Sequence, residues 1–122
     1  MITLNINLYK AVKAQLEEQN IAADYRDANG IIIISQDELE KVTSLNLENS
    51  EIDDLTGLDA FTNVTSINLH ANKLTENSNL QVLDSLSLTD LDLSSNQLRS
   101  IKSITSYSDI TNADITNQRI TE

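Results

Sequence analysis

The single histidine of the chain, His70, stands between two residues that could act with it in a hydrolytic site. Glu48 precedes His70 by 22 residues, and Ser94 follows it by 24 residues. An acid, an imidazole and a hydroxyl are the groups of a serine-hydrolase triad, and neighbouring strands about 4.8 Å apart would bring them together in that order. Catalysis also requires an oxyanion hole and a pocket that excludes water, which an open sheet does not supply. We therefore predict an ordinary exposed histidine and a protein that is not an enzyme.

A metal site is the second kind of chemistry to weigh. Residues 24–30, Asp-Tyr-Arg-Asp-Ala-Asn-Gly, have the carboxylates and the glycine of a calcium loop. With Gly30 at the sixth loop position, however, Tyr25 would be first and Gln36 twelfth, where Asp and Glu are required. The chain also has no cysteine, which excludes disulfides and thiolate ligands. The sequence therefore predicts no metal and no cofactor, and Asn29-Gly30 predicts a tight turn instead.

Charge and hydropathy narrow the range of partners. The 122 residues carry 19 acidic against 8 basic side chains, a formal charge of −11, which repels phosphate backbones and anionic membrane surfaces. The longest apolar run, residues 31–34, is far shorter than the roughly 20 residues of a membrane-spanning helix. We expect one domain with an aliphatic core, no binding of nucleic acid and no insertion into a membrane.

The elements that would position these residues follow from an internal repeat. Four segments share the pattern apolar-x-x-apolar-x-apolar-x-x-polar-x-apolar, with threonine after the first apolar residue each time. They begin at Val42, Val64, Leu88 and Ile110, with spacings of 22, 24 and 22 residues, and this period is that of leucine-rich repeats. The alternating centre of each segment predicts a short strand that pairs in parallel with the next one.

The return half of each repeat carries a different period. Apolar residues stand at every third position in 55–61 and again in 101–107, which predicts a 3₁₀-like return on the side opposite the strands. The intervening repeat has the extra residues 76–79, for which a bulge and a fuller helical turn both remain open.

The polar position of the repeat predicts a ladder inside the solenoid. Asn72 and Asn96 occupy it in the two central repeats, and Ser50 and Gln118 occupy it in the terminal ones. An amide that points inward must bond to backbone groups of adjacent turns to be tolerated. We expect Asn72 and Asn96 to do so, and Ser50 and Gln118 to replace the amide where the ladder has a single neighbour.

Residues 1–41 lack the repeat and predict an amino-terminal cap ahead of the repeats over 42–122, because the end of a solenoid needs an atypical unit with one polar side. The apolar residues Leu8, Val12 and Leu16 predict a helix over about 8–19. Asn7 is the expected N-cap of this helix.

Two further signals divide the rest of the cap. Hairpin-like strands are expected within about 21–35, on either side of Asn29-Gly30. Ser35-Gln-Asp-Glu38 has the pattern of a capping box and predicts the start of a short helical turn.

From Ile34 to Leu58 the sequence reads ISQDELEKVTSLNLENSEIDDLTGL, and it resembles the cap and first repeat of the internalin-type bacterial leucine-rich-repeat proteins. The resemblance extends over roughly residues 4–120. It implies an α/β, right-handed leucine-rich-repeat solenoid with a short parallel sheet on its concave side, a 3₁₀ or irregular convex side and an amino-terminal α-helical cap. The chain departs from the family pattern by having no proline near Thr56-Gly57.

The resemblance also implies a function. Such proteins are noncatalytic protein–protein interaction modules, secreted or at the cell surface, and some bind a host-cell receptor through the concave sheet. The first residues here do not form a signal peptide, so export is implied by the resemblance alone. Most family members have more repeats and an immunoglobulin-like cap after them, and we therefore expect further sequence or a partner over the carboxyl-terminal repeat edge. The alternatives are a cytoplasmic bacterial regulator or effector with the same binding face and a structural spacer of a larger surface protein.

The expected binding face consists of the side chains that the core does not use. None of them is Trp, Tyr or Arg, the residues that dominate binding hot spots, so a polar or basic partner surface is favoured over an apolar one. The face is acidic toward its carboxyl-terminal end. Its expected partner-binding residues are Asn46, Glu48, Asn68, His70, Asp90, Asp92, Ser94, Asn112 and Asp114.

Overall fold

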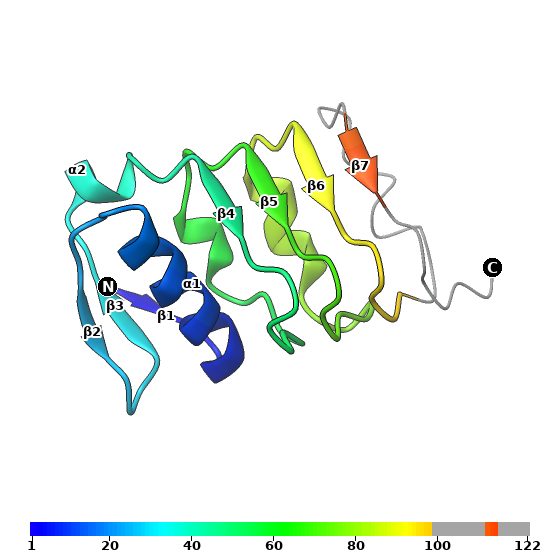
Figure 1. Cartoon of the computed structure of the whole chain (residues 1–122), viewed down its shortest axis with the longest axis horizontal. Coiled ribbons are helices and arrows are strands. Elements are labelled where there is room, and N and C mark those ends of the chain that lie inside the picture. Colours follow the sequence, from blue (N-terminus) through cyan, green and yellow to red (C-terminus); the bar gives the residue numbers. More distant parts are fainter. Residues whose placement is uncertain (99–111, 115–122) are drawn as a thin grey trace.

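The chain forms a cap followed by a stack of similar turns, as a computed structural model shows (Figure 1). The structure describes residues 1–98 and, as a strand backbone, residues 112–114. In this part of the chain each turn contributes one short strand to a parallel sheet, and the return halves lie on the other side of the core. The fold is therefore an α/β solenoid.

The parallel sheet has the strand order in which the repeats occur in the sequence. Its strands are β4 (Ser44–Asn46), β5 (Ser66–Asn68), β6 (Asp90–Asp92) and β7 (Asn112–Asp114), in the order β4-β5-β6-β7. The register pairs equivalent positions of successive repeats. Each row across the sheet therefore contains one residue from every repeat.

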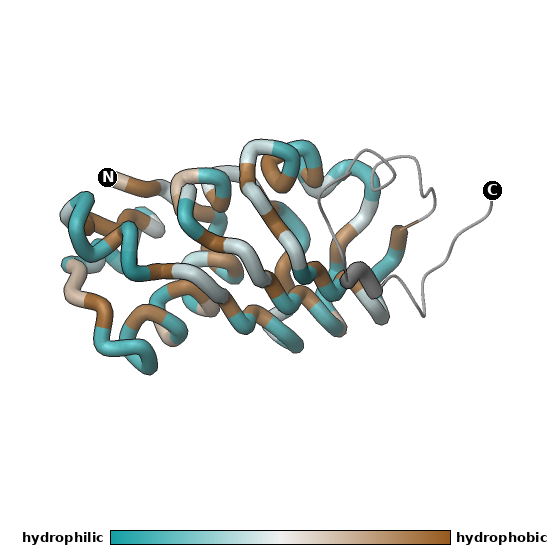
Figure 2. Tube along the Cα trace, turned by 90° about the horizontal axis from the view of Figure 1, so that it is seen from above, coloured by the Kyte–Doolittle hydropathy of each residue, from teal (hydrophilic) through white to brown (hydrophobic). Residues whose placement is uncertain are grey.

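The core is a column of aliphatic side chains between the sheet and the return halves. Leu45, Ile67 and Leu91 are the central residues of three strands, and all are buried. Apolar positions recur in each turn and alternate with polar ones along the trace (Figure 2). Phe61 is the one aromatic residue of the repeats in the described core. Thin layers of leucine and isoleucine suit this stack, because each turn packs only on its neighbours.

The return halves contain 3₁₀ turns, as their three-residue period predicts. Element η1 spans Leu58–Ala60, and η2 spans Leu80–Ser85. The extra residues of the second repeat form a turn, in which Ser78 N donates to Thr75 O at 3.1 Å and Ser78 Oγ accepts from Thr75 N at 2.9 Å. The extra residues therefore form a turn, and the 3₁₀ segment that follows them, η2, is longer than η1.

The chain leaves each strand through a left-handed residue. Asn49, Ala71 and Ser95 have φ angles of 52°, 58° and 57° and occupy the same position of three repeats. Asn49 N donates to His70 O at 2.8 Å, and Ala71 N donates to Ser94 O at 2.9 Å. The left-handed conformation turns the chain away from the strand while its N–H still bonds to the next turn.

The cap consists of a helix against a small antiparallel sheet. Helix α1 spans Ile6–Glu18, and the strands β1 (Ile2–Thr3), β2 (Asp24–Arg26) and β3 (Ile31–Ile33) pair in the order β1-β3-β2. Strand β1 is not predicted by the sequence pattern because it has only two residues. No helix in the described part of the chain is long and apolar enough to cross a membrane.

The helix begins two residues earlier than the pattern predicts. Asn5 is its N-cap residue, and Asn7 lies inside the helix. The expected cap at Asn7 is therefore wrong. The Asn7 side chain instead donates to Glu51 O at 3.1 Å and so ties the helix to the first repeat.

The predicted capping box forms only in half. Ser35 Oγ accepts from Glu38 N at 3.2 Å at the start of α2 (Gln36–Leu39). The Glu38 carboxylate does not return to Ser35 but accepts from Ala22 N at 3.0 Å and from Lys41 Nζ at 2.7 Å. The bond from Lys41, followed by the bond from Ala22, lowers the pKa of the Glu38 carboxyl.

Candidate protein-interaction face

The face of the parallel sheet that points away from the core carries the expected binding residues. Ser44, Ser66 and Asp90 form one row across the strands, and Asn46, Asn68 and Asp92 form the next. The side chains on β4 are exposed, and those on β5 and β6 are half-buried. The backbone register continues the two rows through Asn112 and Asp114 of β7, whose side chains lie outside the described part of the structure.

The side chains of the second row also bond to the backbone at the ends of their strands, a role that was not predicted from the sequence. Asn68 Oδ1 accepts from His70 N at 2.9 Å, and Asp92 Oδ1 accepts from Ser94 N at 2.9 Å. Asn46 Oδ1 makes the same bond to Glu48 N at 3.3 Å. Such side-chain bonds two residues ahead are a local preference of Asn and Asp. One oxygen of each side chain therefore helps to end its strand, and the signal was the Asn or Asp at this position in all four repeats.

His70 and Ser94 meet, but the hydrogen-bond partners of Ser94 do not suit a triad. The two atoms His70 Nδ1 and Ser94 Oγ lie 2.7 Å apart, and the Ser94 hydroxyl donates to Asp92 Oδ1 at 2.5 Å. A serine hydroxyl has a single proton and a carboxylate only accepts, so His70 Nδ1 must donate to Ser94. In a catalytic triad the histidine accepts the serine proton instead.

The acid of the supposed triad has another partner. Glu48 Oε2 accepts from Asn68 Nδ2 at 3.2 Å. Ser94 is also only 4% exposed, so it does not present its side chain to a partner as expected. His70 is half-buried beside Ser94 and not the exposed histidine that the sequence predicts, whereas Glu48 is exposed.

The inward amides lie where the repeat pattern predicts them. Asn72 is 6% exposed, and its Oδ1 accepts from Ser50 N at 2.9 Å and from Ile52 N at 3.0 Å. Its Nδ2 donates to Leu47 O and to Leu69 O, both at 3.0 Å. One side chain thus bonds to backbone groups of two turns.

Asn96 repeats the arrangement one turn later. It is 4% exposed, accepts from Leu74 N at 3.0 Å and donates to Leu69 O and Leu93 O at 2.9 Å. Ser50 does not act in this way, since its hydroxyl donates to Glu48 O of its own turn at 2.9 Å. The fourth expected member, Gln118, lies outside the described residues.

A row of threonines at the start of the strands forms a second ladder. Thr65 Oγ1 lies 3.4 Å from Thr43 O, and Thr89 Oγ1 lies 3.3 Å from Thr65 O. The backbone N–H groups of Thr65 and Thr89 donate to the same carbonyls at 2.9 and 2.8 Å. This contact accounts for threonine after the first apolar residue of each repeat.

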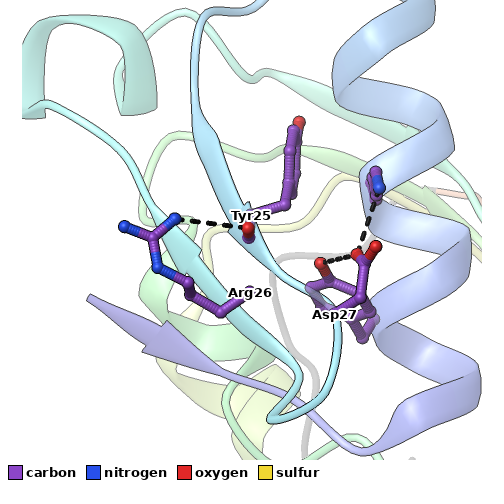
Figure 3. A network of polar contacts seen from close by, with 5 residues as sticks. Tyr25, Arg26 and Asp27 are labelled. Carbon is purple, nitrogen blue, oxygen red and sulfur yellow. Dashed lines mark hydrogen bonds and ion pairs between the residues drawn. The ribbon is translucent and has the colours of Figure 1, made fainter.

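The cap has a separate polar cluster between its helix and its hairpin (Figure 3). Asp27 Oδ1 accepts from the Tyr9 hydroxyl at 2.5 Å and from Lys13 Nζ at 3.1 Å. Lys13 Nζ also lies 5.0 Å from the centre of the Tyr25 ring, which contacts the Tyr9 ring edge-on at 6.4 Å. Burial and then the Asp27 bond raise the pKa of Tyr9 to about 12, and the Tyr9 and Lys13 bonds lower the pKa of Asp27.

Two shallow hollows flank this cluster. One, of about 380 Å³, is lined by Tyr9, Lys13 and Asp27 among others, and the other, of about 540 Å³, extends past Tyr25 to Ile33. Both are wide open to solvent. Tyr9, Lys13 and Asp27 in the first hollow bond to one another, whereas the buried hydroxyl of Tyr25 beside the second has no hydrogen-bond partner within residues 1–98. Within residues 1–98 no group of three or more His, Cys, Asp or Glu side chains is placed to hold a metal ion.

Comparison with solved structures identifies the fold, whereas comparison with sequence families does not. No protein-family model matches the sequence, and no curated protein matches it either. Among solved structures, internalin C2 of Listeria monocytogenes superposes with a TM-score of 0.76 at 24% sequence identity, over 99% of this chain and 49% of that one. The internalin InlF of the same organism superposes with a TM-score of 0.72 at 21% identity, over 95% of this chain and 31% of that one. The chain thus has the internalin-type leucine-rich-repeat fold that the sequence predicts, and it spans less than half of either internalin.

Proposed function

We propose that the chain is a noncatalytic protein-interaction module that binds its partner through the exposed face of the parallel sheet. The observation that carries this proposal is that two neighbouring rows of side chains on that face have different hydrogen-bonding roles. Asn46, Asn68 and Asp92 each accept a backbone hydrogen bond at the end of a strand. The neighbouring row, which contains Ser66 and Asp90, makes no such bond within residues 1–98. Ser66 and Asp90 have no side-chain hydrogen bond within residues 1–98, so they remain available to a partner.

The chemistry of the face favours a polar or basic partner surface. Glu48, Asp90 and Asp92 are acidic, and His70 is the one basic side chain in the described rows. No large aromatic residue is present to anchor an apolar partner. Opposite charge across an interface speeds association and selects among partners.

The resemblance to internalins supports the remaining parts of the proposal. It favours a secreted or surface-exposed location and a host-cell protein as partner, with residues 1–41 closing the sheet and residues 42–122 supplying the binding face. Fractionation of the producing cells tests the location, because a cytoplasmic regulator would stay with the cytosol.

Site-specific cross-linking tests the binding face. A photo-reactive amino acid at Ser66 samples the sheet, and one at Asp59 samples the opposite side, where Asp59 is exposed. We expect the same partner to be captured repeatedly from Ser66 and not from Asp59. Equal capture from both positions contradicts the proposal, and no capture from Ser66 favours a spacer.

A matched pair of variants completes the test. Glu48→Lys and Asp59→Lys change the net charge by the same amount at exposed positions. Glu48→Lys should weaken the captured complex at least tenfold, and Asp59→Lys should leave it unchanged. The reverse order would assign binding to the return side.

A further inference from the structure

The cap sheet ends in an edge that no strand of the described residues covers. Its order is β1-β3-β2, and β2 is the outermost strand, on the side away from the parallel sheet (Figure 1). The other edge of the sheet, at β1, packs against the first repeat. Thr3 O lies so close to Gly57 that a Cβ added to Gly57 would be only 2.6 Å from this oxygen. Within the described chain, β2 alone of the cap strands offers a free edge.

The hydrogen-bond pattern shows which backbone groups face outward from this edge. Leu4 N donates to Gly30 O, so the polar groups of Gly30 point toward β1. These groups alternate along a strand, and those of Ile32 therefore also point toward β1. Tyr25 pairs with Ile32 across β2 and β3, so its N–H and C=O point away from the sheet.

The residues on either side of Tyr25 have opposite charges. Asp24 and Arg26 are both exposed, and they lie on the same face because side chains alternate along the strand. Arg26 Nη1 donates to Tyr25 O at 3.3 Å and so partly covers the edge carbonyl. The sequence of the edge is acidic, aromatic, basic.

This sequence is complementary to itself when it is reversed. If two copies pair in antiparallel about Tyr25, the Tyr25 residues exchange two backbone hydrogen bonds. Asp24 of each copy then stands opposite Arg26 of the other copy, at the close, non-hydrogen-bonded distance. No like charges face each other, and the arrangement has the twofold symmetry of most homodimers.

We propose that the β2 edge is a self-association site, at which a second copy of the chain extends the cap sheet from three strands to six. Arg26 exchanges its bond to Tyr25 O for the Asp24 carboxylate of the second copy. The interface is short, so the association is transient and weakens with added salt. It leaves the parallel sheet face uncovered in both copies and does not depend on what that face binds.

Charge exchange at the edge gives the first test. Sedimentation equilibrium would compare the wild type with Asp24→Arg, Arg26→Asp and the double exchange of both residues. Each single variant places like charges opposite one another and should weaken self-association about tenfold. The double exchange, and an equimolar mixture of the two single variants, should restore it.

Asp59→Arg is the matched control, because it makes the same charge change as Asp24→Arg on the return side. Equal self-association of the wild type and both single variants overturns the proposal, as does a mixture that associates no better than its components. Thermal unfolding of each variant establishes that the cap is folded.

Hydrogen exchange of the wild type gives a second test that needs no variant. The Tyr25 amide should exchange more slowly as the protein concentration rises, while the amides of the exposed turn residues 27–29 keep their rates. A Tyr25 amide whose exchange is independent of concentration, in a sample that sediments as a dimer, would place the interface elsewhere and overturn the assignment.

Discussion

Gln15 of the cap helix accepts a hydrogen bond from the backbone N–H of Asn46, at 2.9 Å, on the first strand of the parallel sheet. Gln19, one helical turn later, donates to Ser44 O of the same strand at 3.0 Å and to Gln15 Oε1 at 3.2 Å. Two side chains thus take the place of a preceding strand. The exposed backbone edge that would otherwise pair with another chain is occupied by the cap.

Replacing Gln15 should therefore cost stability. Gln15→Leu removes the acceptor of the Asn46 N–H and one of the two acceptors of the Gln19 amide, and we expect the free energy of unfolding to fall by about 1 kcal/mol. Gln15→Glu keeps the acceptor but loses the bond that Gln15 Nε2 donates to Glu18 at 3.0 Å, so as the control it should cost less than Gln15→Leu. Urea denaturation measures both, and equal losses in the two variants would contradict the role of the acceptor.

The inward amide should matter more than any surface residue. Asn72→Leu removes the partners of Ser50 N, Ile52 N, Leu47 O and Leu69 O, and we expect a loss of about 3 kcal/mol or more, because each buried unsatisfied group costs roughly 1–3 kcal/mol. Ser50→Ala, which removes only a bond within its own turn, should cost less than about 1 kcal/mol. The midpoint of urea unfolding distinguishes the two, and an unchanged midpoint for Asn72→Leu would disprove the ladder.

Ala71 offers a stabilising change. Its φ of 58° places it in the left-handed region, where an L-residue costs about 1–2 kcal/mol and glycine does not. Ala71→Gly should raise the free energy of unfolding by about 0.5 kcal/mol once the greater freedom of the unfolded glycine is included. Ala14→Gly within helix α1 is the control and should lower it by about 1 kcal/mol. A loss in both variants would argue against relief of strain at Ala71.

The tyrosine of the cap cluster should make the fold sensitive to alkali. The pKa of Tyr9 is raised from 10.0 to about 12, so the unfolded chain loses this proton first as the pH rises. The stability contributed by Tyr9 is complete below pH 10 and declines as the pH rises through about 12. Phenolate absorbance should show a tyrosine that titrates well above the ordinary range. Tyr9→Phe should remove that transition and reduce the loss of stability above pH 10.

His70 should reveal its proton position directly. Because the Ser94 hydroxyl bonds to Asp92, neutral His70 should carry its proton on Nδ1. Nitrogen NMR of the ring distinguishes the two tautomers. A proton on Nε2 would reverse the direction of the His70–Ser94 bond and restore the possibility of a triad.

The repeat pattern was sufficient to predict the strands of the parallel sheet and their partners. The reason is that Leu45, Ile67 and Leu91 repeat a two-residue alternation whose apolar side can only face the core. The cap was less predictable. Its helix begins at Ile6, before the first residue of the apolar pattern, and the Asn7 side chain bonds to Glu51 O in the first repeat.

The candidate face was predictable in position but not in chemistry. The sequence shows that Asn68 and Asp92 lie on the sheet, and it does not show that their oxygens bond to the chain two residues ahead. Ser94 is predicted at the surface and is buried, where its hydroxyl contacts both Asp92 and His70. The glutamines that close the sheet edge carry no pattern at all, because their partners lie in another element.

The two internal ladders have a common direction. Asn72 completes the turn before it, at Ser50 and Ile52, and Asn96 does the same at Leu74. The hydroxyls of Thr65 and Thr89 also point back along the chain. The backbone groups of one turn therefore obtain all their hydrogen bonds only when the next turn has folded. During synthesis on the ribosome, the first turn can pack on the folded cap. Each turn can form its last hydrogen bonds only after about one further repeat has been synthesised, so folding of the solenoid follows synthesis with a delay of one repeat.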